Sequence, residues 1–318
     1  MQLYHHPYSL DSQKVRLALE ENGIDYTSYH VNPLTGKNMD ASFFRMNPRA
    51  KLPVFKNGSH IIFDTIEIVQ YIERIAVVSS GGNSNALSNR EINGWMQKIQ
   101  GWNPKIFTLS HIPDKYRLFV SKFIRRVVIA RMAKSPDLAS VYHLKLKDAY
   151  ETEDKLKNPA VMKRSEEQLV RLLDEVETQL NETAYLAGEE FTMADAILVP
   201  VLARLVLLNL EDVYICSRPK IAEYWSVVQQ RPSYRKVIGK IALLALRFAT
   251  ELLADSDISR LESSFSCSAH VLIVRLSIKF NHVSKGGNSA ATTLLELMFR
   301  KEEIQLLTTL LEQPSRPE

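Results

Sequence analysis

Ser9 is the side chain of this sequence best placed to act on a sulfur atom. It follows a short apolar-leaning stretch, residues 2–5, and stands directly before a helical pattern that starts at Leu10. Serine is favoured as the N-cap of a helix, because its oxygen accepts a hydrogen bond from an unpaired backbone N–H. The same helix terminus favours a negative charge, and together with the hydroxyl it would lower the pKa of a thiol bound there. The capping role and the functional role of Ser9 are therefore compatible.

The expected task of Ser9 is to stabilise the sulfur of another molecule rather than to attack as a nucleophile. The sequence has no GxSxG elbow and no evident histidine–acid order that would activate a serine. Neither Ser9 nor Ser12 is a cysteine, and the two cysteines of the chain, Cys216 and Cys267, lie far from both in sequence. A mixed disulfide at this position is therefore excluded, which argues against thiol-transferase and dehydroascorbate reductase chemistry.

The dipeptide Leu52-Pro53 is the second candidate for binding chemistry. It lies between a loop and a predicted strand, where an ordinary proline at the start of a strand is the simpler interpretation. A cis bond at this position would instead turn the backbone N–H and C=O of Leu52 toward a cleft. There they would pair with the main chain of a bound peptide, as in strand addition.

Asp64 and Thr65 precede a predicted helix and form the third candidate. Both residues suit helix capping, and both also suit a ligand, because the carboxylate would take an α-ammonium and the helix terminus an α-carboxylate. Lys51 and Lys37 would pair with a second, distant carboxylate. A zwitterion at one end and a carboxylate at the other describe the two ends of glutathione.

The composition excludes several other functions. Hydrophobic content of 45% and charged content of 24% are typical of a globular protein. The net charge of +4 comes from 40 basic and 36 acidic residues without a dense basic stripe, so no nucleic-acid partner is expected. No Walker loop, GxGxxG or HExxH motif is present, and the adjacent His5 and His6 would face opposite ways on a strand. We therefore expect no metal site.

The cysteine content and the apolar runs indicate the compartment. Two cysteines without a CxxC motif are typical of a reducing environment. The N-terminus has no apolar secretory core, and the longest apolar runs, at 241–246 and 271–274, are too short to span a bilayer. The expected location is the cytosol, and no transmembrane segment is predicted.

The elements that must position these residues alternate in the first 75 residues. Helices are predicted to begin at Leu10 and Thr65, the second running to residue 75, with a short helical turn at Phe43 and Phe44. Four strands are predicted at residues 2–5, 26–31, 52–56 and 61–63. The order, βαβ followed by ββα, predicts an α/β domain of thioredoxin-like kind.

The remainder of the chain, to about residue 239, lacks convincing strands and is predicted to be helical. Thr192 and Asp195 match a capping signature that opens an almost wholly apolar helix, which is typical of a domain centre. The helices are expected at residues 90–107, 115–131, 142–155, 165–180 and 196–210. The domains are accordingly predicted as 1–78, a linker at 79–89, an all-α domain at 90–240 and a poorly ordered tail at 241–318.

Residues 1–240 resemble the cytosolic glutathione transferases. The similarity is carried by YHHPYSLDSQKVR at residues 4–16 and by NPRAKLP at residues 47–53, and it is strongest to the plant tetrachlorohydroquinone dehalogenase-like class. The resemblance implies a thioredoxin-like domain, an all-α C-terminal domain and a homodimer. It also places Ser9 where serine-type members hold the hydroxyl that stabilises the glutathione thiolate.

The resemblance further implies residues that bind glutathione along its length. Leu52 and a cis-Pro53 would hold the cysteinyl backbone, and Asp64 and Thr65 would hold the γ-glutamyl end. The glycyl carboxylate would meet the polar residues of two loops, namely Lys37, Asn38 and Lys51.

The leading hypothesis is a detoxifying transferase in which a thiolate formed beside Ser9 attacks an apolar electrophile or reduces a hydroperoxide. The class takes its name from a reductive dehalogenase with chemistry like that of cysteine-type relatives, which the serine here disfavours. Two alternatives stay open. One is a non-catalytic protein that binds and carries a ligand in the same pocket, and the other is a membrane-peripheral protein that acts through its basic helical region and tail.

Overall fold

The computed structural model describes residues 1–80, 86–111 and 119–239. The predicted tail at 241–318 lies outside the described residues. Within the described part, no helix has the length and apolar character that crossing a bilayer requires.

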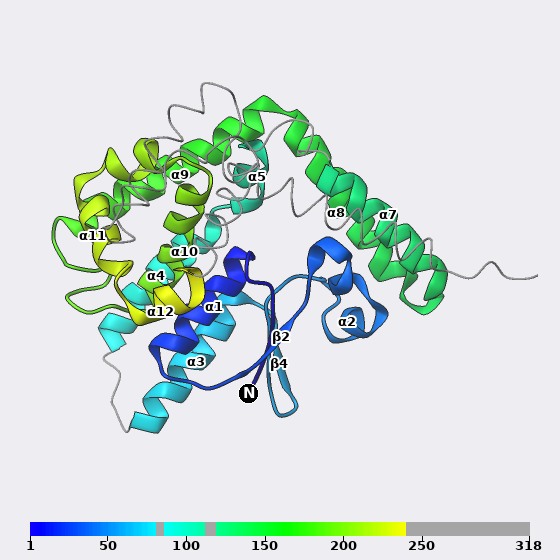
Figure 1. Ribbon diagram of the computed structural model, residues 1–318, viewed down its shortest axis with the longest axis horizontal. Coiled ribbons are helices and arrows are strands. Elements are labelled where there is room, and N and C mark those ends of the chain that lie inside the picture. The colour runs from blue at the N-terminus through cyan, green and yellow to red at the C-terminus, as the bar shows by residue number, and fades with distance from the viewer. Residues whose placement is uncertain (81–85, 112–118, 240–318) are drawn as a thin grey trace, which may run out of the picture. The chain divides into compact units, whose positions relative to one another are not determined.

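The described residues form an N-terminal half with a sheet, residues 1–80, and a C-terminal, helical half, residues 86–111 and 119–239. The sheet has four strands (Figure 1). Its order is β2-β1-β3-β4, with β1 parallel to β2 and antiparallel to β3, and β4 antiparallel to β3. Leu3 pairs with Phe55 in the register, and both side chains are fully buried. The strands are β1 (Gln2–His5), β2 (Thr27–His30), β3 (Val54–Asn57) and β4 (His60–Ile62). This arrangement confirms the predicted thioredoxin-like order.

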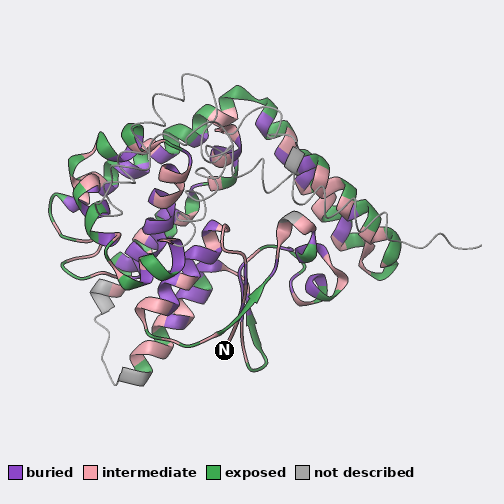
Figure 2. Ribbon diagram, in the orientation of Figure 1, coloured by how far each residue is buried: buried purple, intermediate pink, exposed green. Residues whose placement is uncertain are grey.

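Two helices of this half, α1 (Leu10–Glu21) and α3 (Thr65–Ser80), pack against each other. Leu17 and Leu19 of α1 and Ile72 of α3 are excluded from solvent. Figure 2 shows buried stretches on both helices. The helix α3 was expected to end at residue 75 but continues to Ser80. Since α4 begins at Ala86, both ends of the predicted linker, 79–89, are helical.

The C-terminal half is helical over its described residues, as predicted. In the N-terminal half, two short 3₁₀ turns and α2 (Ala41–Met46) lie between β2 and β3. The longer helices that follow are α4 (Ala86–Gly101), α5 (Pro104–Ser110), α7 (Phe119–Lys134), α8 (Ala139–Lys157), α9 (Pro159–Leu180), α10 (Met193–Leu207) and α11 (Pro219–Val228).

Among the helix boundaries that differ from the prediction, two fall at an Asn-Pro pair. The single helix expected at 90–107 is broken, because Asn103 caps α5 by accepting from the Lys105 N–H at 3.1 Å and Pro104 opens it. Likewise, Asn158 accepts from the Ala160 N–H at 3.0 Å, so α9 begins at Pro159 rather than at residue 165. Proline suits the first helical turn, where its missing N–H is not needed.

The helix α10 is buried on nearly all sides, and the capping pair predicted at its start is confirmed. The Asp195 carboxylate accepts from the backbone and hydroxyl of Thr192, at 2.8 and 2.9 Å. It also accepts from the Leu186 N–H and the Tyr224 hydroxyl, both at 3.1 Å. Burial raises the pKa of Asp195, and the hydrogen bonds from these donors act in the opposite direction. The buried carboxylate is therefore satisfied by protein donors.

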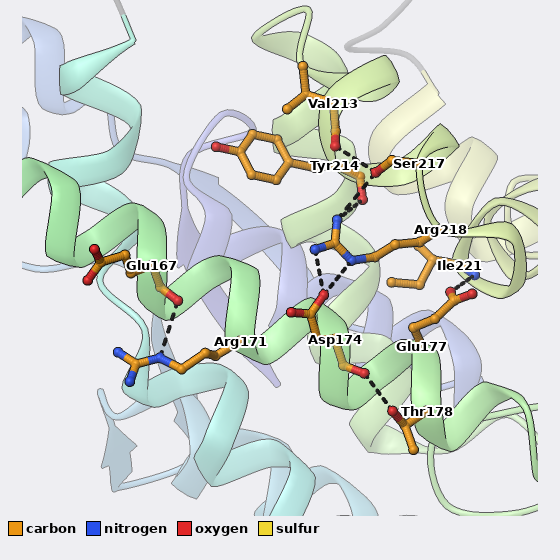
Figure 3. A network of polar contacts seen from close by, with 10 residues as sticks. All are labelled: Glu167, Arg171, Asp174, Glu177, Thr178, Val213, Tyr214, Ser217, Arg218 and Ile221. Carbon is orange, nitrogen blue, oxygen red and sulfur yellow. Dashed lines mark hydrogen bonds and ion pairs between the residues drawn. The ribbon is translucent and has the colours of Figure 1, made fainter.

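Carboxylates of α9 hold the start of α11 in place (Figure 3). Asp174 accepts from Arg218 at 2.6 and 3.0 Å, and Arg218 also donates to the Tyr214 carbonyl. Glu177 accepts from the backbone N–H of Ile221 at 2.8 Å, and so acts as a cap supplied by another helix. These contacts fix α11 against α9.

Candidate functional site

Ser9 is the N-cap of α1, as predicted. Its backbone is extended, and its Oγ accepts a hydrogen bond from the Ser12 N–H at 3.4 Å. The Ser12 hydroxyl is buried and accepts from the His6 N–H, also at 3.4 Å. The Ser9 side chain is only half-buried, so its hydroxyl hydrogen can be donated to a bound group. The capping role is therefore confirmed, and the functional role remains compatible with it.

The loop that carries Ser9 is held by side chains from two helices. The Gln13 amide of α1 donates to the Pro7 carbonyl at 2.8 Å. The Arg204 guanidinium of α10 donates to the Tyr8 carbonyl at 2.6 Å, across 196 positions in sequence. These bonds fix the backbone on the N-terminal side of Ser9, and with it the direction of the Ser9 side chain.

Arg204 is a site residue that the sequence analysis missed. Burial of its charged group lowers its pKa to about 10, with Asp11 acting in the opposite direction, so the guanidinium is charged at neutral pH. A positive charge next to the Ser9 loop favours an anion bound there. The signal for it was an arginine inside an otherwise apolar helix.

A buried polar cluster joins the first turn of α1 to α4. The Lys14 ammonium, which is 2% exposed, donates to Gln100 at 2.6 Å and to Asp11 at 3.1 Å. Burial lowers the pKa of Lys14, and the Asp11 carboxylate offsets part of this effect. The helix that presents Ser9 is thus anchored to the helical half.

The Leu52–Pro53 peptide bond is cis, and Pro53 is buried. The preceding loop is braced by Asn47, whose amide donates to the Lys51 carbonyl at 2.8 Å. It is also braced by Asn38, whose amide donates to the Ala50 carbonyl at 2.9 Å. Asn38 is buried and positions the loop. A contact between Asn38 and a ligand remains a prediction.

Asp64 caps α3, and Thr65 is buried in the first turn. The Asp64 carboxylate accepts from the N–H groups of Ile66 and Glu67, at 3.0 and 3.2 Å through one oxygen. The capping interpretation is thus confirmed. The other carboxylate oxygen has no protein donor among the described residues, so it is available to the predicted α-ammonium.

Lys37 and Lys51 are exposed on the loops before and after α2. Within the described residues, neither ammonium has a carboxylate partner. Both are therefore available to an anion. Their assignment to the glycyl carboxylate remains a prediction.

No cysteine chemistry is added to this site by the described residues. Cys216 lies in a short π-helix, Asp212–Cys216, and its pKa is raised by partial burial and by Glu211 and Asp212. A raised pKa lowers the thiolate fraction and so the reactivity. Cys267 lies outside the described residues, and in the described part no three His, Cys, Asp or Glu side chains form a metal-binding group.

Sequence comparisons place the chain among known proteins. Residues 8–75 match the family model described as the N-terminal domain of glutathione S-transferase, and residues 159–224 match that of its C-terminal domain. The chain is 70% identical over 240 residues to the glutathione S-transferase TCHQD of Arabidopsis thaliana, covering 76% of this chain and 90% of that protein. It is 26% identical over 235 residues to a tetrachloro-p-hydroquinone reductive dehalogenase of Sphingobium chlorophenolicum, covering 73% and 93%.

Solved structures agree at the level of the fold. A crystal structure of poplar glutathione transferase F1 superposes with a TM-score of 0.55 at 20% identity, covering 75% of this chain and 96% of that one. The half with the sheet and the helical half are thus arranged as in that fold. On the identity to the Arabidopsis protein and the two matched domains, the chain belongs to the glutathione S-transferase family.

Proposed function

We propose that the protein is a serine-type glutathione transferase that activates the glutathione thiol beside Ser9. The observation that carries the proposal is the position of the half-buried Ser9 hydroxyl at the N-terminus of α1, beside a loop fixed by Arg204. The helix terminus, the hydroxyl and the guanidinium all favour the thiolate over the thiol.

Glutathione would lie along the residues already described. The backbone of Leu52 beside the cis-Pro53 would pair with the cysteinyl residue. Asp64 would take the γ-glutamyl ammonium through its second oxygen, next to Thr65. The glycyl carboxylate would meet the basic and amide residues Lys37, Asn38 and Lys51. These roles rest on chemistry and on family resemblance.

In the proposed conjugation, the glutathione thiol loses its proton to solvent, and the Ser9 hydroxyl donates a hydrogen bond to the sulfur. The sulfur lone pair then forms a C–S bond with the electrophilic carbon, and the leaving group departs with its bonding electrons. In hydroperoxide reduction, two glutathione molecules give one disulfide, one alcohol and one water. Proximity and thiolate activation provide the rate.

The activity in the name of the similar Sphingobium protein, reductive dehalogenation, is not extended to this chain. Its assignment here would require a thiol able to exchange with a glutathione disulfide. Both Ser9 and Ser12 lack that sulfur, and the Cys216 thiol has a raised pKa. We propose conjugation or peroxide reduction, in a cytosolic homodimer, as the activity to test.

The direct test is the variant Ser9→Ala, with Ser226→Ala as its control. Ser226 is exposed on α11, and its hydroxyl donates only to the Glu223 carbonyl. Ser9→Ala should lower kcat with chlorodinitrobenzene by about 100-fold and leave the glutathione Kd nearly unchanged, because the hydroxyl acts mainly on the charged sulfur.

Turnover at saturating glutathione that is the same in Ser9→Ala and in the parent protein would contradict the proposal. Tight binding of apolar ligands in calorimetry, with no turnover of any electrophile, would instead indicate a non-catalytic carrier.

A further inference from the structure

A cluster of lysines surrounds one carboxylate on α8. The Asp148 carboxylate lies 3.7 Å from the ammonium of Lys105, on α5, and 3.7 Å from that of Lys145, one turn earlier on α8. The Lys105 ammonium also donates to the Thr152 hydroxyl at 2.9 Å. A separation of 3.7 Å is long for a hydrogen bond, so both ammonium groups retain N–H donors for another acceptor.

The cluster carries more positive than negative charge. Lys51, on the loop before β3, follows Ala50, which packs in one apolar cluster with Tyr142 and Leu146 of α8. The Lys51 charge lowers the pKa of both Lys105 and Lys145, so three lysines share one carboxylate. Burial lowers the pKa of Lys105 and of Lys145, and the neighbouring lysines lower both further. The Lys145 side chain is only 14% exposed. Partly buried charges of one sign need a counter-ion.

The neighbouring carboxylates of α8 have cationic partners of their own. Arg125 of α7 and Lys157 of α8 both contact Glu153, and Lys147 lies 3.9 Å from Glu151 on the exposed side of α8. The lysines around Asp148 have no second carboxylate within ion-pair distance among the described residues. An external anion would supply it.

The position of the cluster relative to Lys51 is fixed by packing. The hairpin of α7 and α8 lies against α2 and the preceding turn (Figure 1), where the Tyr142 hydroxyl donates to the Met39 carbonyl at 2.9 Å. Two ion pairs flank this contact, Arg131 with Asp40 at 2.6 Å and Arg45 with Asp137 at 2.8 Å. The hairpin lies outside both segments matched by the family models, 8–75 and 159–224.

We propose that Lys105 and Lys145, together with Lys51, bind a carboxylate of a ligand in the glutathione site. The proposal rests on the proposed function, which brings the glycyl carboxylate of glutathione to Lys51. The carboxylate has two sources, the glycyl end of glutathione or an acidic group on the acceptor. In either case the α7–α8 hairpin contributes to substrate selection.

The experiment compares acid and ester forms of each ligand. Lys145→Met removes the charge and keeps an unbranched apolar stem, Lys145→Arg keeps the charge, and Lys147→Met is the matched exposed control on the same helix. Binding is measured for glutathione and its glycyl ethyl ester, and KM for chloronitrobenzoate and its methyl ester. The double variant Lys105→Met/Lys145→Met is measured in the same way.

If the glycyl carboxylate is the ligand group, Lys145→Met weakens glutathione binding by about 10-fold and leaves the ester unchanged. If the acceptor carries it, the KM for chloronitrobenzoate rises by a similar factor, and the KM for its methyl ester does not. Lys145→Arg should retain most of the affinity for whichever ligand, glutathione or chloronitrobenzoate, carries the bound carboxylate. A folded double variant with unchanged preference between acid and ester for both ligands would overturn the proposal.

Failure of the proposed function gives a different result. In that case the parent protein would not bind glutathione, whereas calorimetry with chloronitrobenzoate and its methyl ester alone would still report on the lysines. An acid preference that is lost in the double variant supports the site without glutathione, and no acid preference in the parent protein overturns it.

Discussion

At the scale of single residues, Ser9 shows how one side chain serves both folding and a proposed reaction. Its oxygen caps α1, and the same geometry presents the hydroxyl where the N-terminal N–H groups of the helix favour an anion. The cap bond to the Ser12 N–H is long, at 3.4 Å, so the Ser9 oxygen is not strongly committed to it. A cysteine there would gain exchange chemistry, which the serine lacks.

Arg204 supplies the first prediction at this scale. Arg204→Met removes the hydrogen bond to the Tyr8 carbonyl and the positive charge beside the Ser9 loop. We expect the thiol pKa of bound glutathione, read from the pH dependence of kcat/KM, to rise by about one unit. The exposed Arg171 of α9 (Figure 3), which donates only to the Glu167 carbonyl, provides the control Arg171→Met. An identical pH profile for Arg204→Met and the parent protein would contradict the role of Arg204.

At the scale of elements, Gly36 brings the loop before α2 into contact with the α7–α8 hairpin. Its φ is +72°, and a Cβ added there would lie 2.6 Å from the Val127 Cγ1 of α7. Gly58, in the turn between β3 and β4, has φ +59° but no atom within 4 Å of an added Cβ. The two glycines share the backbone strain, and only Gly36 adds the steric contact.

The matched pair Gly36→Ala and Gly58→Ala separates these effects. Gly58→Ala should lower the free energy of unfolding by about 1 kcal/mol from left-handed backbone strain. Gly36→Ala should lower it by about 1–3 kcal/mol more, because Val127 must move. Chemical unfolding measures both, and equal losses for the two variants would show that the hairpin does not press on Gly36.

The elements were mostly predictable because their signals are local. Strands and helices in the first half follow from alternating and helical spacing, and the Thr192/Asp195 cap from two residues three positions apart. The break at Asn103 was missed, and the helix after Asn158 was predicted to begin at residue 165 instead of 159, although an Asn followed by Pro suits a helix start. Arg204 was not assigned, because its contact with Tyr8 depends on packing between distant segments.

At the scale of the whole molecule, polar contacts join the two halves around the site. Besides Lys14 with Gln100, Arg231 forms two hydrogen bonds with Glu21 at the end of α1, at 2.6 and 2.9 Å. The helix that carries Ser9 is therefore tied to the helical half near both of its ends. A ligand that binds beside Ser9 should stabilise both halves together.

Glutathione at about 100 times its Kd should raise the free energy of unfolding by about 2.7 kcal/mol. The gain should be equal when unfolding is followed by far-ultraviolet circular dichroism and by tryptophan fluorescence, because the two halves should unfold together. Fluorescence reports on the helical half, where all three tryptophans lie, namely Trp95, Trp102 and Trp225. Stabilisation seen by circular dichroism alone would show that the halves unfold separately.

Thiolate activation by Ser9 is tested most directly by an ultraviolet difference titration of glutathione bound to the parent protein, to Ser9→Ala and to Ser226→Ala. We expect thiolate absorbance at neutral pH in the parent protein and in Ser226→Ala. In Ser9→Ala the thiol pKa should return toward its free value, about 8.5 for a cysteine thiol. The same titration curve in all three proteins would contradict thiolate activation by Ser9.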